Sequence, residues 1–388
     1  MNIINGRNIL ELTGKLISEF PDRQAGKSTG KYCAQKIAEC FQAAAKNSLT
    51  TLETFTCHPQ VFFSWCRFSA IAYFISAVLL ICHCPIISLL LISVAAMYIL
   101  IVFGVYNHCF DFLFPAQTGY NVVTQILPTD KAQKQIIITA HHDAAPVFCL
   151  LELNPRLYPK LMFAAVAVFL LLILNALISC FLFLPNWIYW LQMCGVIFML
   201  PVAFLTGAAV SPGASDNLVS AALLIELARE LSKKPLKHTK IILASFDAEE
   251  CGLRGSAAFL KQHLLTDLPA NAIIIDTIYR QENLTVLTRD LNSLIPLSKS
   301  LADDLIRLYP MKSGGMPPGG GATDAANFAK AGIPAVILTA METDPAKWSA
   351  TFPYHTSRDT PEIIDESAVN TLFQLLVTYL RRESVVSD

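Results

Sequence analysis

The sequence predicts an α/β fold with a mostly parallel central sheet and helices on both of its faces. It also predicts about four transmembrane helices, paired as two hairpins. Continuous runs of Ile and Leu at 136–138, 241–243 and 273–275 alternate with amphipathic helical segments, which is typical of strands buried on both faces. Two stretches, Phe68–Phe110 and Leu161–Val210, contain no Asp, Glu, Lys or Arg, and each is long enough for two membrane spans of about 20 residues.

The composition limits the classes of partner and compartment. The 388 residues are 54% hydrophobic and only 15% charged, which is too apolar for an ordinary soluble domain. The net charge of −1 leaves no electrostatic footprint for nucleic acid, so we expect no nucleic-acid partner. Glu11 and Lys15 interrupt the first segment, so we expect no signal peptide. The eleven cysteines lack disulfide-framework spacing, which suits a reducing compartment.

Each apolar run contains a plausible turn near its middle. The sequence His83–Pro85 divides the first run, and Pro185–Trp187 divides the second. Tyr189 and Trp190 follow the second turn, where an aromatic belt at a membrane surface would place them. Buried hairpins in a soluble core are the alternative, but globular cores rarely sustain such charge-free lengths. The motif Cys82–Cys84 is more typical of a turn than of a metal clip.

Three polar pieces remain when the apolar runs are removed. We expect residues 1–66, 111–160 and 211–388 to form one globular domain, with transmembrane hairpins at 67–110 and 161–210 inserted into it.

The polar pieces read as alternating helices and strands. The first piece predicts a loop, an amphipathic helix around "KYCAQKIAECFQAAA" and the strand "TLETFTC". The second predicts the strands "GYNVVTQILP" and "KQIIITAHHD", separated by the turn "TDKAQK". In the third, an amphipathic helix is predicted to follow the cap-like residues Ser215–Asn217. Further helices are predicted over "RGSAAFLKQHLL", "LIPLSKSLADDLIRLY" and "ESAVNTLFQLLVTYLRR", alternating with the strands "KIILASFD", "NAIIIDTI" and "GIPAVILTA".

Carboxylates and imidazoles follow the carboxyl ends of these strands. In parallel sheets these ends share one edge, which is where ligands bind. A single acid at a strand end is usually a cap or turn residue, but a whole set converging on one edge is not explained by capping. The residues concerned are His141, His142, Asp143, Asp216, Glu249, Glu250, Asp276, Tyr354, His355 and Asp359.

These side-chain types indicate a catalytic metal site. Imidazole and carboxylate without thiolate suit zinc, manganese or cobalt. Two imidazoles and three carboxylates are enough for two metals that share a bridging carboxylate. Of the adjacent Glu249 and Glu250, one can bind metal while the other faces the bound water as a general base.

The ordered motifs "AHHD", "GASDN", "FDAEECGLRGS", "IIID" and "YHTSRDTP" resemble the M28 family of zinc aminopeptidases. "RQAGKSTG" and "GYNVVTQILP" also resemble its N-terminal segment, so the resemblance covers about 280 residues outside the apolar runs. It implies two zinc ions and a zinc aminopeptidase-like fold. On this resemblance one zinc is bound by His141, Asp216 and Asp276, and the other by Asp216, Glu250 and His355.

The roles of Glu249 and Asp143 also follow from the resemblance. Glu249 would activate a metal-bound water as the general base, and Asp143 would orient the His141 imidazole. Tyr354 would donate a hydrogen bond to the developing oxyanion or simply pack in its loop. His142 points to the opposite face and is expected to be structural. The implied function is a membrane-anchored di-zinc metallo-aminopeptidase, a hydrolase that removes N-terminal residues from short peptides.

One departure from the family pattern and two alternatives remain. The loop before the "GIPA" strand keeps Asp324 but has Ala325 where members often carry a histidine, which leaves open which substrate residue the enzyme prefers.

Glutaminyl cyclases resemble the same family and bind a single zinc, so a cyclase is the first alternative function. A catalytically inactive membrane scaffold is the second, although no ligand or general base is missing.

The chemistry also constrains the topology. Because His141 and Asp216 are expected at the same zinc, the insert between them must cross the lipid bilayer an even number of times. We therefore expect a multi-pass integral membrane protein with both hairpin tips opposite the catalytic domain. Lys and Arg flank the spans on the catalytic side, and the positive-inside rule places that side in the cytoplasm. The oligomeric state is not indicated.

Overall fold

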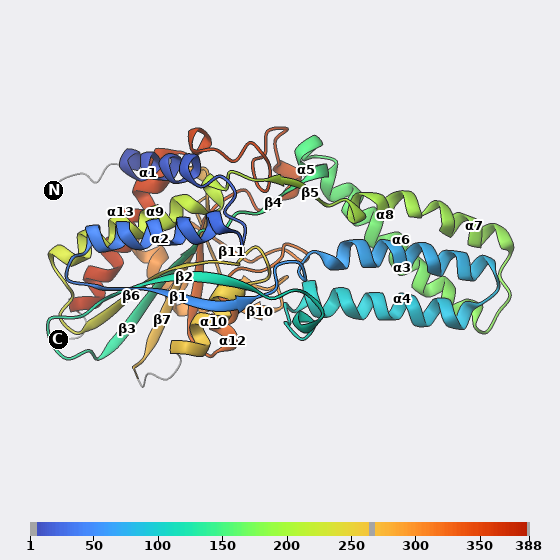
Figure 1. The fold of residues 1–388 in the computed structure, drawn as a ribbon, viewed down its shortest axis with the longest axis horizontal. Coiled ribbons are helices and arrows are strands. Elements are labelled where there is room, and N and C mark those ends of the chain that lie inside the picture. Colours follow the sequence, from blue (N-terminus) through green and yellow to red (C-terminus); the bar gives the residue numbers. More distant parts are fainter. Residues whose placement is uncertain (1–5, 264–267, 386–388) are drawn as a thin grey trace.

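The computed structural model describes residues 6–263 and 268–385. A globular α/β part carries a rod of apolar helices that projects from one end (Figure 1). The N-terminal helix α1 (Gly6–Glu19) and the C-terminal helix α13 (Glu366–Val385) both lie in the globular part. The apolar inserts therefore leave the first and last polar pieces packed together.

The central sheet has eight strands in the order β1-β2-β6-β3-β7-β12-β8-β11. Its strands are β1 (Leu49–Cys57), β2 (Gln117–Ile126), β3 (Lys134–His141), β6 (Thr239–Phe246), β7 (Ala270–Ile278), β8 (Thr285–Leu287), β11 (Lys312–Gly314) and β12 (Ala335–Ala340). The four central strands β6, β3, β7 and β12 are parallel, which confirms the predicted sheet type. The β1–β2, β2–β6 and β12–β8 pairs are antiparallel.

Both faces of the sheet are covered because successive strand residues point to opposite sides. Ile136, Ile138 and Leu243 pack in one cluster with α1, α2 (Ser28–Ala44), α9 (Val219–Lys233), α11 (Lys299–Leu308) and α13. Ile137 and Ile242 belong to a second cluster, with α10 (Arg254–His263) and α12 (Ala325–Lys330) on the other face. This alternation produces the continuous apolar runs of the sequence.

Four helices in the described part of the chain are long and apolar enough to cross a membrane, spanning Ser64–Ile81, Pro85–Gly104, Tyr158–Ser179 and Asn186–Ala203. They correspond to α3 (Ser64–Ile81), α4 (Pro85–Ile99) with the π-helix η1 (Leu100–Gly104), α6 (Tyr158–Ser179), and α7 (Asn186–Cys194) with α8 (Val196–Ala203). They lie side by side in the rod, and the predicted turns at His83–Pro85 and Pro185 lie between them. The existence of four candidate spans is thus confirmed.

The structure corrects three expected boundaries. The last residues of the second apolar run form β5 (Thr206–Val210), which pairs with β4 (Pro146–Phe148), because both flank the insert where it leaves the globular part. The helix expected directly after the cap-like Ser215–Asn217 begins at Val219, because Ala214–Leu218 form the π-turn η3. The helix expected from Leu294 begins at Lys299, because Ile295–Pro296 (β10) pairs with β9 (Arg289–Asp290) and the Ser298 hydroxyl caps the helix.

Short elements complete the fold. They are α5 (Cys149–Leu153) and the 3₁₀ turns η2 (Asp111–Leu113), η4 (Gln281–Asn283), η5 (Pro345–Lys347) and η6 (Pro361–Ile363). The helix predicted over "RGSAAFLKQHLL" is described only to His263, so its last two predicted residues lie outside the described part of the chain.

Candidate metal centre

The candidate centre lies beyond the carboxyl ends of the central strands. His141 is the last residue of β3, and Glu249 and Glu250 follow β6 by three and four residues. Asp276 lies near the end of β7, and Asp216 lies in the π-turn before α9. His355 comes from the loop that follows β12. Parallel pairing of β6, β3 and β7 is what brings these distant residues to one edge.

The ligand atoms form groups that share residues. Within each group, one atom per residue lies within 4.8 Å of the others. The groups are His141–Asp216–Asp276, Asp216–Glu250–His355 and His141–Glu249–Glu250. The structure therefore brings together all five residues predicted as ligands, as well as the predicted general base.

Asp216 lies between the two histidines. Its Oδ1 is 3.2 Å from His141 Nε2, and its Oδ2 is 3.2 Å from His355 Nε2. Glu250 Oε2 is also 3.2 Å from His355 Nε2, whereas Glu249 Oε2 is 3.9 Å from His141 Nε2. Each oxygen of the Asp216 carboxylate thus faces a different imidazole, which is the arrangement of a bridging ligand.

These distances fit a metal ion. Two ligand atoms on a tetrahedral zinc at about 2.0–2.1 Å are roughly 3.4 Å apart, close to the separations between the imidazole and carboxylate atoms. The buried Glu250 Oε1 has no hydrogen-bond partner among the described residues. The donor set of imidazoles and carboxylates, without cysteine, suits an open catalytic zinc site.

Electrostatics also favour a cation at this edge. Burial raises the pKa of Glu250 to about 7 and that of Asp276 to about 6. Burial raises the pKa of Glu249 well above its ordinary value, with the Glu250 and Asp276 charges adding to the effect. For His355, burial lowers the pKa, but the carboxylates of Glu250 and Asp216 outweigh it and raise the pKa to about 10. The carboxylates repel one another and stabilise positive charge among them.

Asp143 connects the two loops that carry the ligands. Its Oδ1 lies 3.3 Å from His141 Nδ1, the nitrogen that faces away from Asp216. The same carboxylate accepts hydrogen bonds from the backbone N–H groups of Glu249, at 3.2 Å, and Glu250, at 3.1 Å. Asp143 can therefore orient the imidazole and also hold the acidic loop after β6. Sequence reasoning found only the first of these contacts.

Aromatic rings surround His355. The Tyr354 ring stacks on its imidazole with centroids 4.0 Å apart, and Phe148 packs edge-on at 4.4 Å. His355 itself has a positive φ of 51°, a backbone conformation that costs energy for a non-glycine residue and is common at functional sites. The Tyr354 hydroxyl lies in the same neighbourhood as the acidic groups, and burial raises the pKa of Tyr354 well above its ordinary value.

Sequence reasoning missed Arg23. Its guanidinium is fully buried and donates hydrogen bonds to the carbonyls of His142 at 3.1 Å, Phe20 at 3.1 Å and Pro212 at 2.7 Å. The carbonyls of His142 and Pro212 belong to the loops after β3 and before Asp216, whereas that of Phe20 follows α1. An arginine in the loop "PDRQAG" gives no signal of this role in the sequence, because its partners are main-chain groups.

Two further acids support the site. Asp359, singled out only as part of a motif, accepts hydrogen bonds from the backbone N–H groups of Ser215 at 2.8 Å and Asp216 at 3.2 Å. Asp324 is buried with one unpartnered carboxylate oxygen, and burial raises its pKa to about 7. Asp324 immediately precedes α12, whose first residue is Ala325, the position where the family pattern often has histidine.

Other histidines lie outside these groups. His142 Nδ1 lies 2.9 Å from the Ser245 hydroxyl on the neighbouring strand, which fits the expected structural role.

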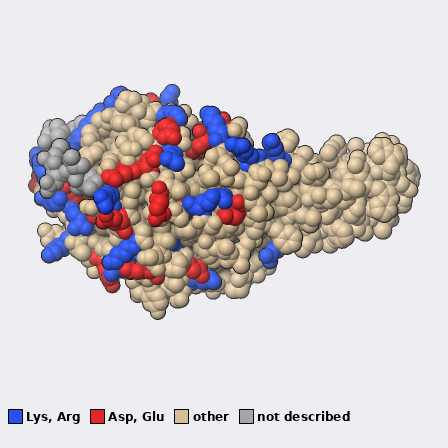
Figure 2. Space-filling view, turned by 90° about the horizontal axis from the view of Figure 1, so that it is seen from above, with Lys and Arg blue, Asp and Glu red and all other residues tan. Residues whose placement is uncertain are grey.

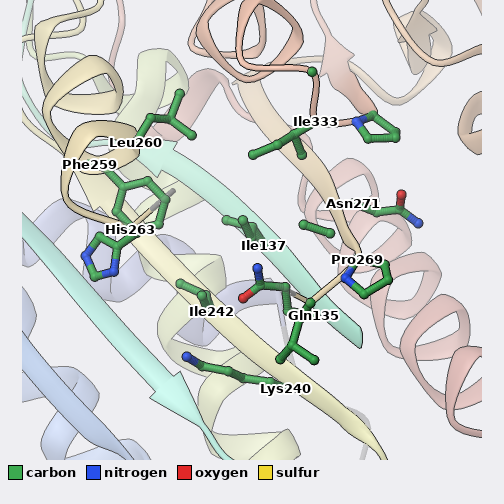
Figure 3. Close-up of a pocket in the computed structure, with 14 residues that line it drawn as sticks. Gln135, Ile137, Lys240, Ile242, Phe259, Leu260, His263, Pro269, Asn271 and Ile333 are labelled. Atoms are coloured by element: carbon green, nitrogen blue, oxygen red, sulfur yellow. The ribbon is translucent and has the colours of Figure 1, made fainter. Parts of the chain in front are cut away.

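A cavity of about 390 Å³ lies on the sheet face beneath α10, lined by Gln135, Ile137, Lys240 and Phe259 (Figure 3). Since Gln135 and Lys240 are the second residues of β3 and β6, this cavity is at the opposite edge of the sheet from the candidate centre.

Comparison with solved structures shows the fold. A glutaminyl cyclase from Porphyromonas gingivalis is 12% identical, with 99% of this chain and 100% of that chain covered and a TM-score of 0.59. A Zn-dependent exopeptidase from Parabacteroides distasonis is 12% identical, with 97% and 98% covered and a TM-score of 0.56. A leucine aminopeptidase precursor from Bacteroides thetaiotaomicron is 11% identical, with 98% of each chain covered and a TM-score of 0.57. No curated protein matches the sequence.

The family profile described as Peptidase family M28 matches residues 195–380. This range contains Asp216, Glu249, Glu250, Asp276 and His355, whereas His141 precedes it. The aminopeptidase-like α/β fold and the zinc-type donor set are consistent with the match. Residues 195–380 are therefore similar to peptidase family M28, which supports the prediction of a metallo-exopeptidase hydrolase.

Proposed function

We propose that this protein is a membrane-anchored di-zinc aminopeptidase that removes N-terminal residues from short peptides. The observation that carries the proposal is the position of Asp216, whose two carboxylate oxygens each lie 3.2 Å from a different imidazole. One ion would be held by His141, Asp216 and Asp276, and the other by Asp216, Glu250 and His355. When bound, zinc would polarise the scissile carbonyl and lower the pKa of a water molecule.

The chain's own residues would supply the proton transfer. Glu249 lies 3.9 Å from His141 Nε2 and is not needed as a ligand in either proposed triad. Its raised pKa, caused by burial, suits a group that takes a proton from the attacking water and gives it to the leaving amine. Tyr354, stacked on His355, would donate a hydrogen bond to the oxyanion as it forms.

The carboxylates at the centre also favour a substrate with a free amine. Because the buried Glu249 and Glu250 and the half-buried Asp276 lie in one cluster of acids, a positively charged α-amine would be attracted to them. The solved structures with this fold include one named a leucine aminopeptidase precursor and one named a Zn-dependent exopeptidase. Both names support removal of residues from a chain end.

The four apolar helices support membrane anchoring. Both hairpins return to the globular part, so the proposal places their tips on the opposite side of the bilayer from the catalytic centre. Arg67, Arg156 and Lys160 lie in or before the first turns of α3 and α6. By the positive-inside rule, these cations favour a cytoplasmic catalytic domain.

Two substitutions test the catalytic assignment. Glu249→Gln should retain bound zinc but reduce turnover of an unblocked dipeptide by about 10²–10⁴-fold, the usual contribution of a general base. Glu250→Ala should lose zinc as well as activity. Zinc is measured by elemental analysis of the purified protein, and turnover by amino-acid release. Full activity of Glu249→Gln would exclude Glu249 as the base.

A glutaminyl cyclase is the second candidate, favoured by the fold shared with the Porphyromonas gingivalis enzyme. A peptide panel separates the two functions. An aminopeptidase releases the first residue from an unblocked peptide and does not cleave its N-acetylated form. A cyclase instead releases ammonia from a peptide that begins with Gln, with one zinc per chain. Cleavage of acetylated peptides at the same rate would exclude an aminopeptidase.

A further inference from the structure

The roots of both hairpins contact the loops of the candidate centre. Here a root is the segment where a hairpin joins the globular part: residues 105–114 for the first hairpin and residues 146–160 for the second. In the first root, Asp111 accepts a hydrogen bond from Arg254, which begins α10 just after the Glu249–Glu250 loop. His108 Nε2 lies 2.9 Å from the carbonyl of Gly252 in that loop.

The second root holds the loop of His355. The Glu152 carboxylate of α5 accepts hydrogen bonds from the backbone N–H and the hydroxyl of Ser357, both at 2.8 Å. Arg358 Nη1 lies 3.2 Å from the same carboxylate. Phe148 donates its backbone N–H to the His355 carbonyl at 2.9 Å. A shift of α5 would therefore move the His355 loop.

Exposed apolar side chains lie directly beside these contacts. Leu153, next to Glu152, is 82% exposed, and Phe112, next to Asp111, is 77% exposed. Leu113 and Leu157 are exposed as well. Figure 1 places α5 where the rod meets the globular part. Large exposed apolar side chains such as Leu90 and Phe163 also lie on the helices of the rod.

Unpaired cations accompany the apolar side chains. Arg67, Arg156 and Lys160 are exposed, and none has an ion-pair partner within residues 6–263 and 268–385. Figure 2 shows Lys and Arg side chains up to the boundary of the rod, beyond which the visible surface carries neither charge. Cations next to exposed Leu and Phe are suited to the headgroup region of a bilayer with negative charge.

We propose that the two roots form a contact surface for anionic phospholipid headgroups, and that this contact holds the metal-binding loops in place. The inference rests on the proposed membrane anchoring and goes beyond it, since anchoring alone does not require a charged lipid. Leu153, Leu157 and Phe112 would enter the interface while Arg156 and Lys160 contact lipid phosphates. Glu152 and Asp111 would transmit the position of the roots to the loops of His355 and Glu249–Glu250.

The test uses the full-length protein in nanodiscs of phosphatidylcholine alone or with phosphatidylglycerol. Hydrogen–deuterium exchange is followed in the peptide that covers residues 149–160, and dipeptide hydrolysis is measured in the same discs. Each Lys or Arg near an anionic surface changes a bound-to-free ratio by roughly fivefold. We expect exchange in this peptide to slow by about that factor per cation in anionic discs, with kcat increasing in parallel.

The variant Arg156→Ala/Lys160→Ala should lose this dependence on anionic lipid. In neutral discs its hydrogen–deuterium exchange and its kcat should equal those of the wild type. Lys46→Ala/Lys131→Ala is the matched control, because both lysines are exposed at the opposite end of the sheet. Leu153→Ser should increase exchange in both discs, whereas Leu127→Ser, at another exposed leucine far from the roots, should not.

Equal exchange in neutral and anionic discs would overturn the proposed lipid contact. Lipid-dependent exchange with an unchanged kcat would overturn its coupling to the metal-binding loops. If no disc supports hydrolysis but exchange still depends on lipid charge, the proposed peptidase function fails while the lipid contact is supported.

Discussion

Asp143→Asn is expected to weaken zinc binding and to loosen the acidic loop at the same time. The carboxylate lies 3.3 Å from His141 Nδ1 and accepts hydrogen bonds from the N–H groups of Glu249 and Glu250, one on each oxygen. Asparagine keeps one acceptor oxygen and turns an NH₂ group toward the other donor. Losing one charge-assisted hydrogen bond in a buried site costs about 1.5–3 kcal/mol.

The effect on zinc follows from the contact with His141. Removing a group that orients a metal-bound imidazole typically lowers metal affinity by about 10–100-fold, or about 1.4–2.7 kcal/mol. A competition titration with a fluorescent zinc chelator measures this affinity, and thermal unfolding of the zinc-free protein measures the loop contribution separately. The loss of zinc affinity concerns the zinc-bound protein, and the loosened acidic loop concerns the zinc-free protein. Both measurements should therefore show a change.

Asp247→Asn is the matched control. Asp247 is a buried carboxylate in the same loop that also accepts two backbone hydrogen bonds, from Tyr120 at 2.9 Å and Ala248 at 2.8 Å, but it does not contact a proposed ligand side chain. It should lower the melting temperature without a comparable loss of zinc affinity. If Asp143→Asn bound zinc as tightly as the wild type, the assigned role of Asp143 would be refuted.

Four further outcomes are expected. Arg23→Met should destabilise the protein by about 3–5 kcal/mol, since it leaves buried carbonyls without a charged donor; an unchanged melting temperature would contradict this. Glu152→Gln should reduce kcat more than it changes KM, because it loosens the loop of His355; a change in KM alone would argue against this role. Zinc should raise the melting temperature by an amount that grows with its concentration. At a free zinc concentration of 1,000 times Kd, the folded protein should be about 4 kcal/mol more stable to unfolding than the zinc-free protein. Topology reporters inserted at Pro185 and fused after Asp388 should report opposite compartments; the same compartment for both would exclude either the second hairpin or the shared metal centre.

Much of the fold could be predicted from the sequence because local patterns carry it. Strands such as Ile136–Ile138 are buried on both faces, so their residues are uniformly apolar. The turns at His83–Pro85 and Pro185 interrupt runs of otherwise unbroken hydropathy. Boundaries were less accurate where a residue's state depends on a distant partner. Thr206–Val210 is apolar enough to continue a span, yet it pairs with β4 instead.

The candidate centre could likewise be anticipated from side-chain types at strand ends. Ordered motifs placed His141, Asp216, Glu250, Asp276 and His355 in the site, and the structure brings these five together. The sequence pattern does not indicate that the two carboxylate oxygens of Asp216 face different imidazoles. That geometry requires the π-turn before α9, the end of β3 and the loop after β12 to be folded against one another.

By itself, the sequence determined the element types, the parallel centre of the sheet, the four candidate spans and the residues available as metal ligands. These depend on hydrophobic periodicity and on the chemistry of individual side chains, both of which are local properties. Only the tertiary structure decided that Arg23 and Asp143 support the ligand loops, and that Glu152 joins the second hairpin root to the loop of His355. The partners in these contacts are mostly main-chain groups far away in the chain, and every residue carries the same main-chain N–H and C=O, so the sequence holds no signal for which ones will meet.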